Sequence, residues 1–195
     1  AGPATPTPPR QGAAAAAAYA MPTGDEIDGF GDSIMVGCLD ALRLYFPGIR
    51  MDAVSNRHVS DGVAAIAARG ADTRRAVVVD FGMNAGVDAA EYGHLLDLLG
   101  PDRMIVVVNT YGTYARVPAD NAALEAAVAG RDNVIIADWY ATVKANPGVL
   151  QADKKHPSLR GAHLFAQTVQ KAFADLSERH TGQAVTLKTY PVPAR

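Results

Sequence analysis

The chain has little cysteine and no long apolar run, and neither charge dominates. Cys38 is the only cysteine among 195 residues, so the chain cannot form an internal disulfide, and no Cys/His spacing resembles a zinc site. No apolar run approaches the roughly 20 residues that span a bilayer. The formal net charge of -2 argues against a nucleic-acid or membrane-surface partner. Small neutral or polar substrates remain open, and a chain of this length is typical of one domain.

The two ends differ in composition from the middle. Residues 1–23 combine Pro/Thr repeats with an alanine run, which is typical of a linker. A helix at residues 13–20 is expected only if another segment packs on it. Residues 181–195 are weakly patterned and contain Pro191 and Pro193, so we expect an extended tail there. Residues 24–180 are therefore predicted to form the folded domain.

In this middle part, short apolar segments alternate with segments of helical period. Strands are predicted at residues 26–30, 50–54, 76–81, 104–109 and 134–137, and helices at 33–45, 60–68, 89–99, 120–129, 139–145 and 158–177. The alternation predicts an α/β fold: a single three-layer α/β/α domain with a five-stranded parallel sheet in the order 2-1-3-4-5. Ligands bind at the carboxyl ends of such strands, so the site is expected in the loops there.

The first of these loops carries the most distinctive local motif, Gly-Asp-Ser at residues 31–33. It sets Ser33 at the start of a helix, where the local field is positive and backbone N–H groups can hold a developing oxyanion. Ser and Asp are also preferred helix caps, so the motif alone leaves a purely structural role for Ser33 open.

A serine nucleophile needs a base, and His156 is the strongest candidate. Asp153 lies three residues before it, in the loop that leads into the last helix. Such a carboxylate can orient one ring nitrogen and leave the other to take the serine proton. A turn at the start of that helix is the alternative interpretation. His58, with Asp61 nearby, is a second candidate base, and structural or solvated positions are predicted for His94, His163 and His180.

A third strand-end motif, Gly-Met-Asn at residues 82–84, follows the third predicted strand. The side chain of Asn84 can supply an N–H to an oxyanion, and removing one such donor typically costs about 2.7–4 kcal/mol of transition-state stabilisation. Asn is also a common turn residue after a strand. Each signal is weak by itself, but all three are predicted to fall on one edge of one sheet.

From about Asp25 to Leu176, the motifs and their order resemble those of the SGNH (GDSL-type) hydrolase superfamily. Residues 31–33, 82–84 and 153–157 match its first, third and last blocks. Asn56 occupies the second block, where the family has a glycine whose N–H lines the oxyanion hole. The resemblance implies an oxyanion hole made by Ser33, Asn56 and Asn84. Asn tolerates a positive φ better than most non-glycine residues, so the Asn56 donor can survive the exchange.

Within the superfamily, residues 31–35, 56–61 and 138–140 look most like the extracytoplasmic catalytic domains of bacterial peptidoglycan O-acetyltransferases. Ala85, where typical esterases of the superfamily carry Asp, agrees with this. The resemblance implies that Ser33 accepts an acetyl group and passes it to a sugar hydroxyl, with His156 as base and Asp153 orienting it. No metal or organic cofactor is implied.

The same resemblance implies a setting and partners. A membrane acyltransferase domain would deliver the acetyl donor, a cell-wall glycan would be the acceptor, and the isolated domain would be a monomer. An extracytoplasmic domain tethered through an N-terminal region outside this chain would explain why the chain begins with Ala1 and a linker.

Five residues are expected to shape the acceptor groove, because guanidinium groups and aromatic faces suit sugars: Arg57, His58, Tyr111, Tyr114 and Arg116. Trp139 is a further candidate, although packing in the sheet is the favoured interpretation for it. Two other functions stay open. A carbohydrate or lipid esterase of the same superfamily would use identical residues, and a catalytically silent binding domain would keep only the fold.

Asn56 gives a direct test of the oxyanion hole. If Asn56 contributes only its backbone N–H, Asn56→Gly should retain most of the activity toward an activated acetyl ester, because glycine also supports a positive φ. Initial rates of ester cleavage by the two proteins check this. A large loss of activity in the variant would show that the side chain takes part.

Overall fold

A computed structural model describes residues 17–194 of the chain. Its single sheet has five parallel strands in the order β2-β1-β3-β4-β5. The strands are β1 (Ile27–Gly31), β2 (Arg50–Ala53), β3 (Ala76–Asp80), β4 (Met104–Val108) and β5 (Val134–Ala137). The predicted α/β fold and strand order are confirmed, and every strand end lies within one residue of its predicted position.

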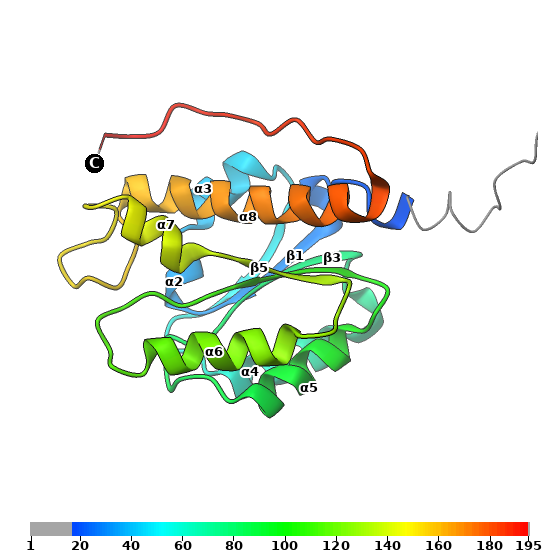
Figure 1. Cartoon of the computed structure of the whole chain (residues 1–195), viewed down its shortest axis with the longest axis horizontal. Helices are drawn as coiled ribbons and strands as arrows, with labels where there is room; N and C mark the ends of the chain where they lie inside the picture. The colour runs from blue at the N-terminus through cyan, green and yellow to red at the C-terminus, as the bar shows by residue number, and fades with distance from the viewer. Residues whose placement is uncertain (1–16, 195) are drawn as a thin grey trace, which may run out of the picture.

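Helices cover both faces of the sheet (Figure 1). One face carries α2 (Ser33–Val36), α3 (Leu39–Tyr45), α7 (Trp139–Ala145) and α8 (Leu159–Thr181), and the other carries α4 (Val59–Arg69), α5 (Ala89–Leu99) and α6 (Val117–Val128). Two short 3₁₀ helices, η1 (Gly24–Glu26) and η2 (Gly70–Asp72), precede β1 and β3. Within residues 17–194, none of the helices combines the length and the hydropathy that crossing a bilayer requires.

The central strands are apolar because both of their faces are covered. β1, β3 and β4 are buried along their whole length, so they contain runs such as Val77–Val79 rather than an alternation of apolar and polar residues. Successive side chains of β3 enter opposite layers: Val78 belongs to the core that contains Met35 and Phe165, and Val79 belongs to the core that contains Tyr92. Each layer is therefore a separate hydrophobic core.

The single helix predicted at residues 33–45 is wrong, because the chain forms α2 and α3 with a break at Gly37 and Cys38. Glycine is a weak helix former, and here the N–H of Gly37 still bonds to Ser33 O (3.1 Å) while that of Cys38 bonds to Met35 O (2.9 Å). A Cβ at Gly37 would lie 3.9 Å from Pro157 Cδ. The break thus lies where the loop before α8 meets α2.

Three other helices differ from their predicted ends by up to four residues, namely α4, α6 and α8. The largest difference at a helix start is in α6, which begins at Val117 rather than at residue 120. Pro118 precedes the predicted start, but proline fits the first turn of a helix, where its missing N–H has no intrahelical partner.

The packed part of the chain starts before the predicted domain boundary at residue 24. Arg75 Nη1 donates to the carbonyls of Ala18 (3.0 Å) and Ala20 (3.1 Å), and the Tyr19 ring stacks on His180 at 3.6 Å. Residues 17 and 18 are helical, whereas residues 1–16, and with them most of the expected linker and helix, lie outside the described residues.

At the other end, residues 183–194 have no regular secondary structure and run back alongside α8 (Figure 1). Tyr190 anchors this tail, since its ring meets Tyr45 edge-on at 4.8 Å. The tail therefore contributes to the outer surface of the layer that contains α3 and α8.

A buried carboxylate ties the amino ends of the strands together. Asp28 is fully buried in β1 and accepts from Arg50 Nε (2.6 Å) and Nη2 (2.7 Å) and from the Arg74 N–H (3.1 Å). The guanidinium groups of Arg69 (3.7 Å) and Arg74 (3.8 Å) also lie near it. Burial raises the pKa of Asp28, but the Arg50 and Arg74 donors outweigh it, so the pKa is lowered. The carboxylate is thus stable in its charged form.

Asp28→Ala should lower the free energy of unfolding by about 3–5 kcal/mol, because it leaves partly buried guanidinium groups without their carboxylate. Denaturant titration at neutral pH measures this. Asp40→Ala is the matched control, since its contact with Arg43 is exposed and long (3.6 Å), and no measurable change is expected. Equal stability of the two variants would contradict a structural role for the Asp28 cluster.

Candidate active site

The turn between β1 and α2 fixes the position of Ser33. The N–H of Asp32 bonds to Asp80 O (3.0 Å), and its carboxylate Oδ1 accepts from the N–H of Ile34 (2.9 Å), which caps α2. Gly31 is required because a Cβ there would lie 2.6 Å from Met35 Cβ. Ser33 is therefore the first residue of α2, at the carboxyl edge of the sheet.

A short hairpin-like loop presents His156 to this edge. The N–H of Gln151 bonds to His156 O (2.8 Å), beside a bridge between Leu150 and Pro157. Asp153 Oδ1 accepts from the N–H groups of Lys155 and His156, both at 3.0 Å. The backbone therefore holds the Asp153 carboxylate in place next to the imidazole.

Ser33, His156 and Asp153 form one hydrogen-bonded chain. His156 Nε2 lies 3.0 Å from Ser33 Oγ, and His156 Nδ1 lies 2.6 Å from Asp153 Oδ2. Hydrogen bonds from the His156 side chain, and then from the N–H groups of His156 and Lys155, lower the pKa of Asp153 to about 2. An ionised carboxylate only accepts, so Nδ1 must carry a proton, and the neutral ring is left with Nε2 to accept from the serine hydroxyl.

The alternative base, His58, lacks such an orienting carboxylate. Asp61 Oδ2 accepts from the backbone N–H of His58 (3.1 Å), at the start of α4, rather than from its ring. Of the other histidines, His94 is exposed on α5 and His163 meets the Tyr45 ring edge-on at 6.0 Å. The ring of His156 is the one that reaches Ser33.

Asn84 connects the segments that carry the three expected oxyanion donors. Asn84 Nδ2 donates to Asp32 Oδ2 and to Arg57 O, both at 3.3 Å, so it bridges the residue before Ser33 and the residue after Asn56. Asn56 adopts a φ of 62°, the left-handed conformation that the exchange from glycine was expected to tolerate. Within residues 17–194, the N–H groups of Ser33 and Asn56 have no protein acceptor. Both are available to a ligand.

Two buried carboxyl groups, those of Asp32 and Asp80, lie at the ends of the adjacent strands β1 and β3, and the sequence did not reveal the second. Burial raises the pKa of Asp32 to about 6. Burial, and then the charge of Asp32, raise the pKa of Asp80 well above its usual range, and Asp80 Oδ2 has no hydrogen-bond partner in the described part of the chain. One signal of this arrangement is present in the sequence, because Asp80 is an acidic residue that directly follows the apolar run of β3.

The two arginines expected in the acceptor groove are bound to internal carboxylates. Arg57 Nη2 lies 2.8 Å from Asp52 Oδ1, and its side chain is only 13% exposed. Arg116 Nε lies 3.1 Å from Asp120 Oδ2, and its Nη2 donates to Met83 O. Their charges are therefore largely neutralised within the protein.

The aromatic candidates divide between surface and core. Tyr114 is exposed beneath the Arg116 guanidinium, which lies 4.7 Å from its ring centre, and Tyr111 packs 5.4 Å from the Tyr140 ring. Trp139 is buried against Phe165, in agreement with the packing role favoured for it, so its ring does not face solvent.

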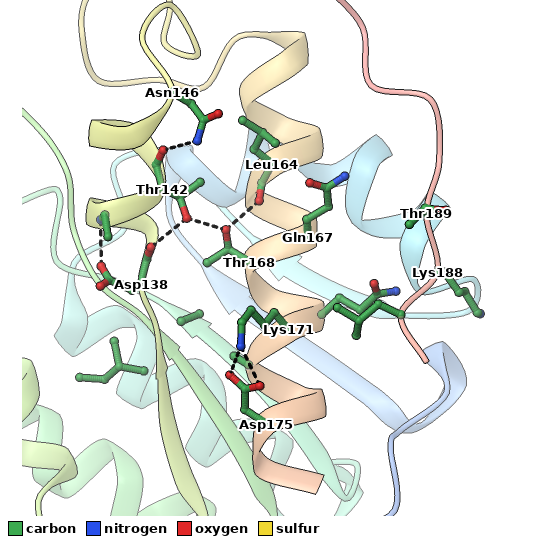
Figure 2. Close-up of a pocket in the computed structure, with 16 residues that line it drawn as sticks. Asp138, Thr142, Asn146, Leu164, Gln167, Thr168, Lys171, Asp175, Lys188 and Thr189 are labelled. Carbon is green, nitrogen blue, oxygen red and sulfur yellow. Dashed lines mark hydrogen bonds and ion pairs between the residues drawn. The ribbon is translucent and has the colours of Figure 1, made fainter. Parts of the chain in front are cut away.

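A cavity away from these residues lies between α7, α8 and the C-terminal tail (Figure 2). It has a volume of about 600 Å³, and hydrogen bonds such as Thr142 to Thr168 (2.9 Å) cross it. Its described lining residues include no serine, histidine or cysteine, so it offers no nucleophile–base pair. Within residues 17–194, no cluster of His, Cys, Asp or Glu is arranged to hold a metal ion.

Comparison with known proteins identifies the fold. The chain matches no protein-family model and no curated protein sequence. It is similar to the catalytic domain of peptidoglycan O-acetyltransferase A from Streptococcus pneumoniae, with a TM-score of 0.67 and 20% identity over 80% of this chain and 97% of that one.

A G-D-S-L family lipolytic protein from Veillonella parvula matches with a TM-score of 0.61 and 19% identity over 75% of this chain and 97% of its own. A family 3 carbohydrate esterase from Talaromyces cellulolyticus matches with a TM-score of 0.61 and 17% identity over 78% of this chain and 98% of its own. The predicted resemblance is thus confirmed at the level of the fold.

The buried carboxyl pair predicts an unusual dependence of stability on pH. In the unfolded chain both carboxyl groups lose their protons near pH 4, whereas in the folded protein their raised pKa values keep them protonated to higher pH. The stability that these protons contribute is fully present below about pH 4 and is lost as the pH rises through the folded pKa, which is about 6 for Asp32. Asp80→Asn removes the part due to Asp80. The variant should melt close to wild type near pH 4 and several degrees higher at pH 7. Thermal scans at both pH values check this, and a lower melting temperature at pH 7 would contradict it.

Proposed function

We propose that the chain is a serine-dependent O-acetyltransferase domain that moves an acetyl group, through acyl-Ser33, to a sugar hydroxyl of cell-wall polysaccharide. One observation carries the proposal: His156 Nε2 lies 3.0 Å from Ser33 Oγ while its Nδ1 lies 2.6 Å from Asp153. These are the contacts that a hydroxyl nucleophile, its base and the group that orients the base require.

In the first half-reaction, Ser33 Oγ attacks the acetyl carbonyl and its proton passes to His156 Nε2. Asp153 stabilises the imidazolium through Nδ1–H. The negative oxygen of the tetrahedral intermediate accepts from the N–H groups of Ser33 and Asn56 and from Asn84 Nδ2, which gives up one of its two long bonds of 3.3 Å. The bond to the leaving group then breaks, and the leaving group takes the proton from His156.

In the second half-reaction, His156 accepts the proton of the acceptor hydroxyl as that oxygen attacks the acetyl carbon of acyl-Ser33. The same donors stabilise the second intermediate. Its collapse breaks the bond to Ser33 Oγ, which recovers the proton from His156. The acceptor leaves as an acetyl ester, and the enzyme returns to its starting state without a cofactor.

Two observations bear on the choice between transfer and hydrolysis. Ala85 follows Asn84 where typical esterases of the superfamily carry Asp, and the neighbours include a peptidoglycan O-acetyltransferase, which supports transfer. The esterase remains a second candidate because the side chains of His156 and Asp153 are 29% and 46% exposed, so water can reach the base. The neighbours also include a carbohydrate esterase.

The proposal extends to the setting of the domain. We infer an extracytoplasmic position, a tether through an N-terminal region, and an acetyl donor delivered by a membrane acyltransferase domain to a monomeric catalytic domain. The hydrogen bonds from Arg75 to the carbonyls of Ala18 and Ala20 mark the place where such a tether would join the folded domain.

The reaction can be tested with an activated acetyl ester, with and without muramyl-glycan oligomers. Ser33→Ala and His156→Ala should each reduce ester cleavage about a thousandfold or more, because they remove the nucleophile and its base. His94→Ala, an exposed histidine on α5, should cleave the ester like wild type. Release of the alcohol and mass spectrometry of acetylated glycan measure the two half-reactions.

Each outcome separates the candidates. Acetylated glycan supports the transferase, whereas fast ester cleavage with no acetylated glycan would leave the esterase. If a reactive phosphonate fails to label Ser33 in the wild-type protein, the chain is a catalytically silent binding domain.

A further inference from the structure

The loop that carries the candidate base also places a lysine directly beside it. Lys155 lies between Asp153 and His156, and the N–H groups of Lys155 and His156 both bond to Asp153 Oδ1 at 3.0 Å. The carboxylate that orients the His156 ring therefore also holds the backbone of Lys155. The proton transfers of the proposed reaction do not use the Lys155 ammonium, so its role is open.

This loop lies against α2, the helix that begins at Ser33. His156 Nε2 lies 3.0 Å from Ser33 Oγ, and a Cβ at Gly37 would lie 3.9 Å from Pro157 Cδ. Lys155 precedes His156 directly, and consecutive Cα atoms are about 3.8 Å apart. The Lys155 side chain therefore starts next to the base that reaches the nucleophile.

The charge of Lys155 acts on the buried carboxyl group that precedes Ser33. Burial raises the pKa of Asp32 to about 6, and the charge of Lys155 opposes this rise more strongly than the charge of His156 does. Because the effect of a charge falls with distance, the ammonium lies on the Ser33 side of the loop. Asp32 itself is 1% exposed, and its oxygens accept from a backbone N–H and a side-chain amide. The ammonium is thus near the site without being bound by this carboxylate.

Lys155 also differs from the arginines of this edge in having no counter-ion. Its residue is half-buried, and among residues 17–194 its side chain forms neither an ion pair nor a hydrogen bond. Arg57 and Arg116, by contrast, are bound by internal carboxylates. A cation that is partly out of water is stabilised when an anion joins it. The positive charge available to a substrate beside the base is therefore that of Lys155.

We propose that Lys155 is a specificity-determining residue whose ammonium binds a carboxylate carried by the acceptor sugar. The inference rests on the proposed function and deepens it. The acceptor hydroxyl must reach His156 Nε2, so the sugar that bears it lies next to Lys155. The three N–H donors of an ammonium suit a carboxylate, which only accepts. One unpaired cation balances the single charge of a carboxylate, whereas a phosphate monoester carries about two charges at neutral pH.

The test uses the full chain with an activated acetyl ester as donor and two acceptors that differ in charge. One is a tetrasaccharide of N-acetylglucosamine and N-acetylmuramic acid, whose lactyl groups carry carboxylates. The other is the same tetrasaccharide with these carboxylates converted to methylamides. At pH 7 lysines and carboxylates are charged, so we expect a KM about threefold to tenfold lower for the charged acceptor, with a similar kcat. This preference should shrink as salt is added.

Lys155→Gln should remove most of this preference through the KM of the charged acceptor, because it deletes the ammonium and keeps the N–H that bonds to Asp153. Lys155→Arg keeps the charge and should keep most of the preference. Lys154→Gln is the matched control, since Lys154 is the exposed neighbour in the same loop, and its preference should equal that of wild type. No preference in wild type, or an equal preference in Lys155→Gln, would overturn the assignment.

The same experiment separates this inference from the proposed function. Alcohol release from the ester reports acylation of Ser33, so its absence in wild type would refute the enzyme rather than the role of Lys155. In that case, or if no acceptor is acetylated, calorimetry of Ser33→Ala with the charged tetrasaccharide tests Lys155 directly. Binding that becomes weaker when Lys155→Gln is added would support the role, and equal or undetectable binding in both proteins would refute it.

Discussion

The carboxylate of Asp32 connects the segments of the candidate active site. Oδ1 caps α2 through the Ile34 N–H and so fixes Ser33, while Oδ2 accepts from Asn84, which also reaches Arg57 O. The Asp32 N–H bonds to Asp80 O and joins the turn to the end of β3. The side chains of Asp32 and Asn84 together thus connect three segments that are far apart in sequence. Because the Asp32 carboxyl group lies out of water, its charged form is destabilised, and its raised pKa expresses that cost.

The two poles of the sheet therefore differ in their energetics. At the amino ends, the buried Asp28 is surrounded by Arg50, Arg69 and Arg74, and its pKa is lowered. At the carboxyl ends, burial raises the pKa of Asp32 and Asp80, which lie among few compensating cations. At neutral pH the Asp28 cluster at the amino ends stabilises the fold. Asp32 and Asp80 at the carboxyl ends reduce that stability, while Asp32 orders the polar groups next to Ser33.

The sequence predicts the strands closely because fully buried parallel strands are short apolar runs, and the β-branched run Val77–Val79 is typical of such a strand. It also names Ser33, His156 and Asp153 as candidate residues, and the fold brings their side chains into one hydrogen-bonded chain. What it does not reveal depends on tertiary neighbours. Asp80 is one more polar residue until its partner Asp32 is placed beside it.

The arginines show the same limit. Arg57 is neutralised by Asp52 from the preceding strand, a pairing that requires the folded loop. The partner of Arg116 could have been predicted from the sequence, because Asp120 lies four residues later, a spacing that brings two side chains together on a helix. The break between α2 and α3 was harder to predict, since glycine lowers helix propensity without fixing where a helix ends.

At the amino ends of the strands, Arg75 donates hydrogen bonds to the carbonyls of Ala18 and Ala20, and the Tyr19 ring stacks on His180. These contacts attach residues 18–20 to the sheet at the pole opposite Ser33, so a pulling force on this end of the described chain would act on them before it acted on β1.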